Sequence, residues 1–371
     1  MTTNIDKILK DYKDLGITRA SDAIKYTLFQ TPFATVNNLI GGLPRGRYTT
    51  LAGPEHVGKG AFCAQVIAYL QSQDENFIAL WTDAENSFDE AWASKLGVDL
   101  DRLLIQRYNA EVNTMEKLLD KSLDLLRSLN VSMWVIDSIG ALVPKSDIFK
   151  TQGSNLVDKS LESTNMLNLQ RKLGEFYRKA NIIISPRAKD SYEGCAVILL
   201  GQIYAIPNDV GADLQAVKGG NAVKHWAHLR LLMRRGPRSD WPEPINLKGH
   251  DGVVRKYFPG WSGRIKVDKT RINSNESKEI LLPFTHGKGF DSRVSTINSA
   301  FGLGLIERSG AIYSNQYLPE GKMKGKDNVI KFFTTNDEAY KNLHESVMSV
   351  VIQDVPESEV IKTETNELNN E

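Results

Sequence analysis

The feature that most constrains the fold of this chain is one glycine-rich segment with a lysine, Gly53-Pro54-Glu55-His56-Val57-Gly58-Lys59-Gly60. Residues 48–52 before it have the composition of a buried strand, and residues 62–70 after it continue as an apolar helix. In a strand, loop and helix of this kind, backbone N–H groups surround a phosphate and the lysine reaches the β- and γ-phosphates. The segment predicts an ATP-binding α/β fold, and the alternative is a glycine-rich turn that binds nothing.

The loop departs from the usual pattern directly after Lys59. A Ser or Thr normally stands there and holds Mg²⁺ through its hydroxyl, but this chain has Gly60 and Ala61. Neither side chain can ligate a metal. The sequence therefore predicts binding of ATP and Mg²⁺ with slow hydrolysis.

The composition describes an ordinary globular protein rather than a membrane or disulfide-rich one. The chain has 371 residues, of which 41% are hydrophobic and 25% are charged, so it can form one large domain with smaller attachments. It has no apolar signal core at its start and no apolar run long enough to span a membrane. Cys63 and Cys195 are the only cysteines, and we expect both in the core of a cytoplasmic protein.

Strand and helix patterns alternate through the centre of the chain. We predict strands at residues 77–82, 134–137, 197–202, 229–233 and 264–267, and helices at residues 112–129 and 165–180. Strands that alternate with helices form a mostly parallel sheet with helices on its faces. The predicted fold class is therefore α/β.

The ends of the chain differ from this central part. Apolar residues at helical spacing predict a short N-terminal helix within residues 1–32, and residues 33–291 form the predicted core. A small mixed unit follows at residues 292–353, with helical patterns at 294–301 and 339–351. Residues 354–371 contain six acidic residues and one lysine, which predicts a disordered acidic tail.

Polar residues end or follow three of the predicted strands. Asp137 stands where an aspartate beside a phosphate-binding loop contacts Mg²⁺, usually through water, and its alternative is a helix N-cap. Glu85 can polarise a water molecule for attack on the γ-phosphate. Gln202 can sense the γ-phosphate through a hydrogen bond, or it can be a satisfied buried amide.

Two long segments without a clear periodic pattern lie near this predicted site. They are residues 147–157 and residues 203–218, and we interpret both as irregular loops. Loops of this length are usually functional or disordered. Two of them beside one ATP site indicate a second ligand.

Several sequence blocks occur in the order found in one family. They are Gly41-Gly42-Leu43-Pro44-Arg45-Gly46-Arg47, Asp83-Ala84-Glu85, Lys95-Leu96-Gly97-Val98-Asp99, Val135-Ile136-Asp137-Ser138, Gly219-Gly220-Asn221-Ala222-Val223-Lys224 and the segment 302–314. On these blocks, residues 32–351 resemble RecA-type recombinases. The resemblance implies a RecA-type ATPase core with a short N-terminal helix for subunit contact and a small α/β C-terminal domain. Thr31-Pro32-Phe33 resembles phage UvsX-type members, which would place the protein in a host cytoplasm.

The resemblance also implies roles for residues at matching positions. Residues of the loop would bind the nucleotide, namely Gly53, Pro54, Glu55, His56, Val57, Gly58, Lys59, Gly60 and Ala61. Glu85 would be the catalytic glutamate, Asp137 the metal-side aspartate, and Gln202 the switch to the second DNA loop. Asp89 and Trp92 would contact the adenine. Lys269 and Arg271 would reach the γ-phosphate of a neighbouring subunit, and their alternative is an exposed charged turn.

DNA contacts are expected from the second loop and its surroundings. The candidates are Arg171, Tyr204, Ile206, Pro207, Lys218, Gly219, Gly220 and Asn221. Lysines of the C-terminal unit could gather duplex DNA or could form a solvated surface; they are Lys322, Lys324, Lys326 and Lys331. Residues 185–195 look inserted relative to the bacterial enzyme.

The resulting interpretation is an ATP-dependent recombinase. It would form helical filaments on single-stranded DNA, search double-stranded DNA for homology and exchange strands. One alternative is a hydrolysis-deficient nucleotide-binding scaffold that forms DNA filaments without exchange. Another is a hexameric motor with a RecA fold.

Overall fold

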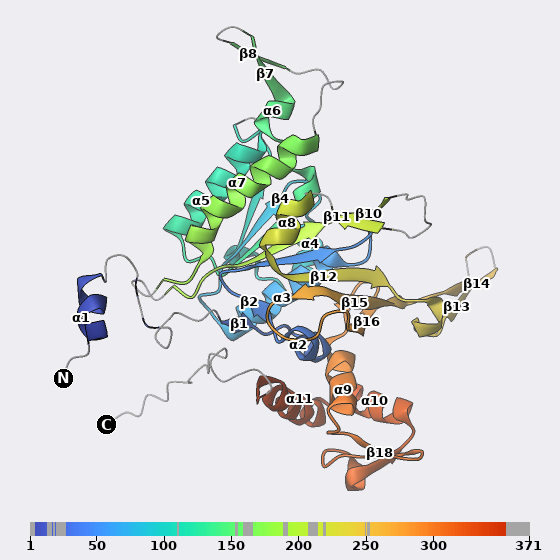
Figure 1. Cartoon of the computed structure of the whole chain (residues 1–371). Coiled ribbons are helices and arrows are strands. Elements are labelled where there is room, and N and C mark those ends of the chain that lie inside the picture. Colours follow the sequence, from blue (N-terminus) through green and yellow to red (C-terminus); the bar gives the residue numbers. More distant parts are fainter. Residues whose placement is uncertain are drawn as a thin grey trace.

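A nine-stranded sheet forms the centre of the molecule, in the strand order β17-β16-β15-β12-β3-β9-β6-β4-β5 (Figure 1). The computed structural model describes residues 4–12, 17, 19, 27–109, 111–152, 155–158, 166–187, 192–206, 214–217, 220–248, 250 and 253–353. The parallel strands are β3 (Tyr48–Ala52), β4 (Ala79–Asp83), β5 (Leu103–Arg107), β6 (Met133–Asp137), β9 (Ala196–Gly201) and β12 (Ala227–Arg235). The strands β15 (Gly260–Thr270), β16 (Glu279–Thr285) and β17 (Gly289–Phe290) continue it antiparallel. The predicted, mostly parallel α/β sheet is confirmed.

Helices cover both faces of this sheet because its strands are apolar on both sides. On β4, Trp81 belongs to the core beneath α3 (Lys59–Gln73), whereas its neighbour Leu80 packs in the core beneath α5 (Met115–Ser128) and α7 (Met166–Ile184). Successive side chains of a strand point to opposite faces. Each parallel strand therefore supplies both cores and is fixed in its register.

The predicted elements lie within a few residues of their observed bounds. The helix predicted at residues 112–129 begins at Met115, because the side chain of Thr114 accepts a hydrogen bond from the N–H of Lys117 and caps it. Cys63 and Cys195 are buried free thiols, as predicted. Burial raises the pKa of the Cys63 thiol well above its usual value, so this thiol stays neutral.

The C-terminal unit has its own core. It contains α9 (Ser292–Gly302), α10 (Lys326–Thr335), α11 (Asp337–Gln353) and a small sheet of β18 (Glu307–Ser309), β19 (Ile312–Ser314) and β20 (Lys322–Lys324). Ile297, Phe333 and Leu343 are among its fully buried side chains. The helix α2 (Ala34–Ile40) joins this core through Ala34, and Thr35 and Ser295 share a hydrogen bond of 2.7 Å between their hydroxyl oxygens.

Both segments interpreted as irregular loops contain paired strands, so that interpretation was wrong in part. Residues 147–157 overlap α6 (Lys145–Ile148) and the hairpin of β7 (Phe149–Gln152) and β8 (Asn155–Asp158). Residues 203–218 contain the hairpin of β10 (Ile203–Ile206) and β11 (Leu214–Val217). In a hairpin the two strands satisfy each other's backbone groups, which needs no amphipathic pattern. A third hairpin, β13 (Ile245–Lys248) and β14 (Val254–Tyr257), follows β12.

The remaining elements are short. They are α1 (Asn4–Asp11), β1 (Leu28–Phe29), β2 (Leu43–Pro44), α4 (Glu90–Lys95), α8 (Gly220–Trp226) and 3₁₀ turns such as Leu100–Arg102. The predicted N-terminal helix corresponds to α1. The predicted acidic tail, residues 354–371, lies outside the described residues. No helix in the described part of the chain has the length and apolarity that a bilayer crossing requires.

Candidate nucleotide-binding site

The glycine-rich loop joins β3 to α3 and needs glycine at two of its positions. A Cβ on Gly53 would lie 2.2 Å from the carbonyl oxygen of Met233 on β12. Gly58 has a φ of +89° and stands at the N-cap of α3, where no side chain caps the helix. The first N–H groups of α3 therefore face the loop without a side-chain partner, as an anion site requires.

Lys59 is the first residue of α3, and its side chain reaches back to the start of the loop. Its Nζ donates to the carbonyl oxygens of Gly53 at 3.0 Å and Pro54 at 2.7 Å. Burial lowers the pKa of Lys59, and the carboxylates of Asp137, Glu85 and Glu55 oppose that shift. The ammonium is thus held inside the loop, where a phosphate would lie between it and the α3 N–H groups.

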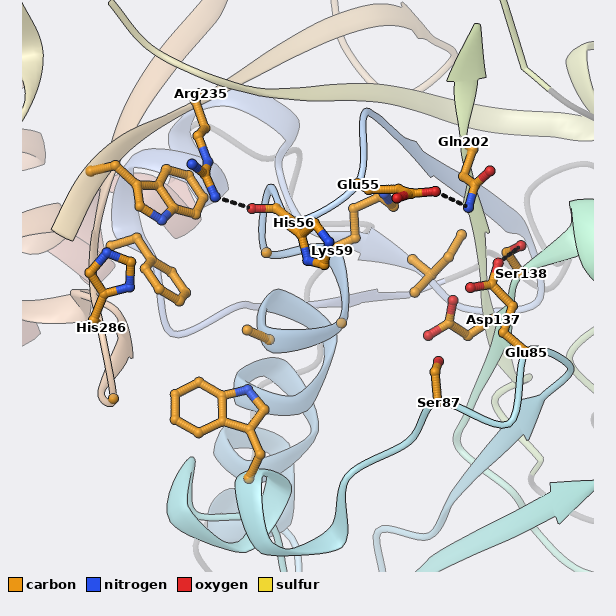
Figure 2. Close-up of a pocket in the computed structure, with 18 residues that line it drawn as sticks. Glu55, His56, Lys59, Glu85, Ser87, Asp137, Ser138, Gln202, Arg235 and His286 are labelled. Atoms are coloured by element: carbon orange, nitrogen blue, oxygen red, sulfur yellow. Dashed lines mark hydrogen bonds between the residues drawn. The ribbon is translucent and has the colours of Figure 1, made fainter. Parts of the chain in front are cut away.

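A pocket of about 700 Å³ opens above this loop, which is a suitable size for a nucleotide. Figure 2 shows Glu85, Asp137 and Ser138 on one side of it, Arg235 and His286 on the other, and Lys59 between them. The predicted residues Glu55, His56, Gly58, Lys59, Gly60, Ala61, Glu85, Trp92, Asp137 and Gln202 all line this pocket. Gly53, Pro54 and Val57 shape the loop without lining the pocket.

The acidic side of the pocket has the donors that a divalent cation needs. Burial, with the nearby carboxylates of Glu85 and Asp83, raises the pKa of Asp137 to about 7 despite the opposing charge of Lys59. Crowded carboxylates beside a phosphate site favour Mg²⁺, which takes oxygen ligands and retains water. Asp137 and Ser138 therefore fit a metal bound through phosphate and water oxygens. Ser138 donates a hydrogen bond to Glu85 as well.

Asp83 holds the loop that carries Glu85. Its side chain is fully buried at the end of β4 and accepts hydrogen bonds from the backbone N–H groups of Ser87 at 2.9 Å and Phe88 at 3.0 Å. The Nε of Arg107, at the end of the neighbouring β5, lies 2.9 Å from the same carboxylate. This network fixes the turn after β4, which carries the exposed side chain of Glu85 at the wall of the pocket.

Of the two residues predicted to contact the adenine, one lines the pocket and the other does not. Trp92 lines the pocket, but Asp89 caps α4 by accepting a hydrogen bond from the N–H of Trp92 at 2.9 Å. The facing wall carries residues that sequence reasoning missed, namely Arg235, Trp261, Phe284, His286 and Gly287. They come from β12, β15 and the end of β16. Their only sequence signal is an aromatic and histidine cluster far from the loop.

Two hydrogen bonds connect the loop to the strands beside it (Figure 2). The Nε2 of Gln202 donates to Oε1 of Glu55 at 3.3 Å, and Gln202 is followed directly by β10. On the other side, a guanidinium nitrogen of Arg235 donates to the carbonyl oxygen of His56 at 2.8 Å. The two strands β9 and β12 that flank β3 are thus each tied to the tip of the loop.

Gly60 has open space around it. A Cβ there would meet only the ring of Trp81, at 4.0 Å, which is ordinary contact. Trp81 is buried, and its indole N–H has no partner among the described residues. A Cβ at position 60 would therefore fit without moving the backbone.

Lys269 and Arg271 lie away from this pocket. The ladder pairs Lys269 with Arg230, and the N–H of Arg271 donates to the carbonyl oxygen of His228, toward the amino-terminal end of β12. Burial and the charges of Arg47, Arg271 and Lys269 lower the pKa of His228 to about 4. The cluster of Lys269, Arg271 and His228 is strongly positive. Because these residues do not line the pocket, a phosphate group that they bind would belong to a nucleotide outside the chain's own loop.

The predicted DNA-contacting residues are spread over the other elements. Arg171 is exposed on α7, Tyr204 and Ile206 lie in β10, and Gly220 and Asn221 begin α8. Pro207, Lys218 and Gly219 lie outside the described residues. The structure therefore places the predicted second loop directly after Gln202, and leaves its DNA contacts a prediction.

Comparison with known families agrees with this geometry. The family model described as the RecA N-terminal domain matches residues 5–245. The match includes the loop, Glu85, Asp137, Gln202 and the strands β3 to β12, which is well over half of the chain. On this match and the site that it spans, the chain belongs to the RecA family.

Proposed function

We propose that this protein forms helical filaments on single-stranded DNA with bound ATP, and that these filaments pair and exchange homologous DNA strands. Its family supports the general part of this function, because RecA-type proteins are ATPases of recombination that bind DNA and oligomerise. The observation that carries the proposal is the hydrogen bond between Gln202 and Glu55. It joins the nucleotide loop to the β10–β11 hairpin.

Five residues of the pocket have a task in this proposal. Lys59 and the N–H groups of α3 bind the phosphates and orient the γ-phosphate toward Glu85. Glu85 accepts a proton from the attacking water, and Ser138 holds its carboxylate in place. A bound Mg²⁺ would neutralise phosphate charge beside Asp137. Trp92 offers an aromatic face to the adenine.

The β10–β11 hairpin is the proposed link to DNA. A γ-phosphate would compete with Glu55 for the amide of Gln202. A shift of Gln202 would move Ile203, which follows it directly and begins β10. The ladder between β10 and β11 transmits such a shift to the whole hairpin, because Ile203 pairs with Val217 and Ile206 with Leu214. Nucleotide state and DNA affinity are coupled in this way.

A second subunit completes the proposed ATP site. Lys269 and Arg271 lie too far along the sheet to line the pocket of their own chain. In a head-to-tail filament they face the pocket of the neighbour. The exposed apolar side chains of α1, Ile5 and Ile8, at 56% and 43% exposure, are a further surface for subunit contact.

Electron microscopy with single-stranded DNA and a nonhydrolysable ATP analogue tests this assembly. An open helical filament that requires both ligands is the expected result. Closed rings would support a hexameric motor instead. Filaments with no strand exchange in any condition would support the hydrolysis-deficient scaffold, which the absence of a hydroxyl at Gly60 favours.

A further inference from the structure

The β13–β14 hairpin exposes large apolar side chains that the proposed site does not use. Its register pairs Ile245 with Tyr257 and Leu247 with Arg255, and residues directly opposite each other share a face. Ile245, Leu247 and Tyr257 therefore form one face, which we call the apolar face. They are 46%, 48% and 43% exposed, although each is a residue type that favours burial.

The other face of the same hairpin carries two lysines and an asparagine beside one exposed valine. Asn246 pairs with Lys256, and Lys248 with Val254. Among the described residues, neither lysine takes part in an ion pair. The hairpin is thus amphipathic, and its two faces suit different surroundings: solvent on the lysine side and a protein surface on the apolar side.

The hairpin is a two-stranded sheet separate from the central one. Figure 1 shows it projecting from the end of β12, and its strands pair only with each other. A two-stranded hairpin alone is marginally stable in water. An apolar face on such a projection gains most when another surface covers it.

The apolar face begins at the mouth of the nucleotide pocket. The ring of Tyr257 lies 6.2 Å from that of His286, which lines the pocket. The hairpin follows β12 in the chain. This strand ends at Arg235, whose guanidinium donates to the carbonyl oxygen of His56 in the loop. Whatever covers the pocket mouth therefore comes into reach of this face.

We propose that the apolar face of the β13–β14 hairpin docks onto a second copy of this chain beside the shared ATP site. The inference rests on the proposed function, in which the neighbouring subunit covers the pocket with Lys269 and Arg271. The oligomerisation of RecA-type proteins supplies the partner. Docking also explains why a strand linked to the nucleotide loop carries an exposed apolar extension.

DNA is the less suitable occupant of this face. Among the paired residues of the hairpin, Arg255 is the only charged residue on the apolar face, whereas Lys248 and Lys256 point to the opposite side. A polyanion would be held by the lysine side. The apolar side chains would then gain nothing from the contact.

Leu247→Asp in the full chain tests the proposal, with Val254→Asp as the matched control. Both replace an exposed aliphatic residue on one hairpin, but Val254 is 60% exposed on the lysine face. Sedimentation measures assembly on long single-stranded DNA with a nonhydrolysable ATP analogue. Leu247→Asp should raise the protein concentration for half assembly about tenfold, and Val254→Asp should leave it within about twofold. Circular dichroism should show the same thermal midpoint for both variants.

A second measurement separates subunit contact from DNA contact. Binding to an oligonucleotide too short for two protomers should be equal in wild type and both variants. Equal assembly of Leu247→Asp and Val254→Asp would overturn the inference and leave the filament proposal standing, as would weaker binding of Leu247→Asp to the short oligonucleotide. A wild-type protein that never assembles would overturn the filament proposal and the inference together.

Discussion

At the scale of single residues, the pocket combines groups that the sequence singled out with groups that it could not. Lys59, Glu85, Asp137 and Gln202 are predictable because each lies at the end of, or shortly after, a strand whose pattern is clear, and the structure brings them into one pocket. Arg235, Trp261 and His286 are not, because they reach the pocket on β12, on the antiparallel β15 and just after β16, all of which are distant from the loop in the sequence. Only the tertiary fold brings these strands beside the loop. The catalytic and binding roles themselves stay predictions.

Gly60 gives the first test at this scale. Gly60→Thr should lower the Mg²⁺ concentration for half-maximal ATP hydrolysis and raise the rate several-fold, since the new hydroxyl supplies the usual metal ligand. The position has room, because a Cβ meets only the Trp81 ring at 4.0 Å. Gly60→Ala, which fills the space without a ligand, is the matched control. A wild-type enzyme already fast at low Mg²⁺ would contradict the missing-ligand argument.

Glu85 gives the second test at the scale of single residues. Glu85→Gln should slow hydrolysis by about 10²- to 10⁴-fold, because the amide keeps the size of the side chain but is a far poorer base. ATP-dependent DNA binding should persist, since Lys59 and the loop remain intact. Single-turnover hydrolysis and fluorescence anisotropy with labelled DNA measure the two effects. Unchanged turnover would remove Glu85 from the catalytic role.

At the scale of elements, the parallel strands and the long helices were predictable and the hairpins were not. Residues 48–52 form a strand at the predicted bounds because all five are buried. The sequences of the hairpins β7–β8 and β10–β11 lack such a pattern, and in the structure each hairpin is a two-stranded sheet separate from the nine-stranded one. Of the antiparallel strands β15, β16 and β17, the sequence predicted only β15, as a strand at residues 264–267.

The coupling between loop and hairpin is testable at this scale. Gln202→Ala should bind ATP normally but lose most of the increase in DNA affinity that ATP causes, because the amide that links Glu55 to β10 is gone. Couplings of this kind are typically about 5- to 150-fold in affinity. DNA titrations with and without the ATP analogue measure it. An ATP effect of wild-type size in the variant would show that the coupling runs elsewhere.

At the scale of the whole molecule, the pocket and the cluster of Lys269, Arg271 and His228 occupy separate places on one sheet. The cluster has the positive charge that a γ-phosphate requires, but it does not line the pocket of its own chain. Head-to-tail contacts between copies bring such places together repeatedly and produce a helix when the rotation does not close. A filament therefore explains both surfaces with one interaction.

Mixed assemblies test this shared site. Lys59→Ala and Lys269→Ala should each be inactive in ATP hydrolysis, but an equal mixture should recover activity at about a quarter of its sites, where an intact pocket meets an intact neighbour. Activity can recover in the mixture only if Lys269 of one protomer acts at the ATP site of its neighbour. No recovery in mixtures shown to co-assemble would place Lys269 outside a shared site.

DNA strand exchange tests the central claim most directly. The protein is assembled with ATP and Mg²⁺ on a single-stranded oligonucleotide, and a labelled duplex of the same sequence is added. We expect ATP-dependent transfer of the labelled strand, with none from a duplex of unrelated sequence and none by Lys59→Ala. Filaments that bind both DNAs but transfer no strand would contradict it.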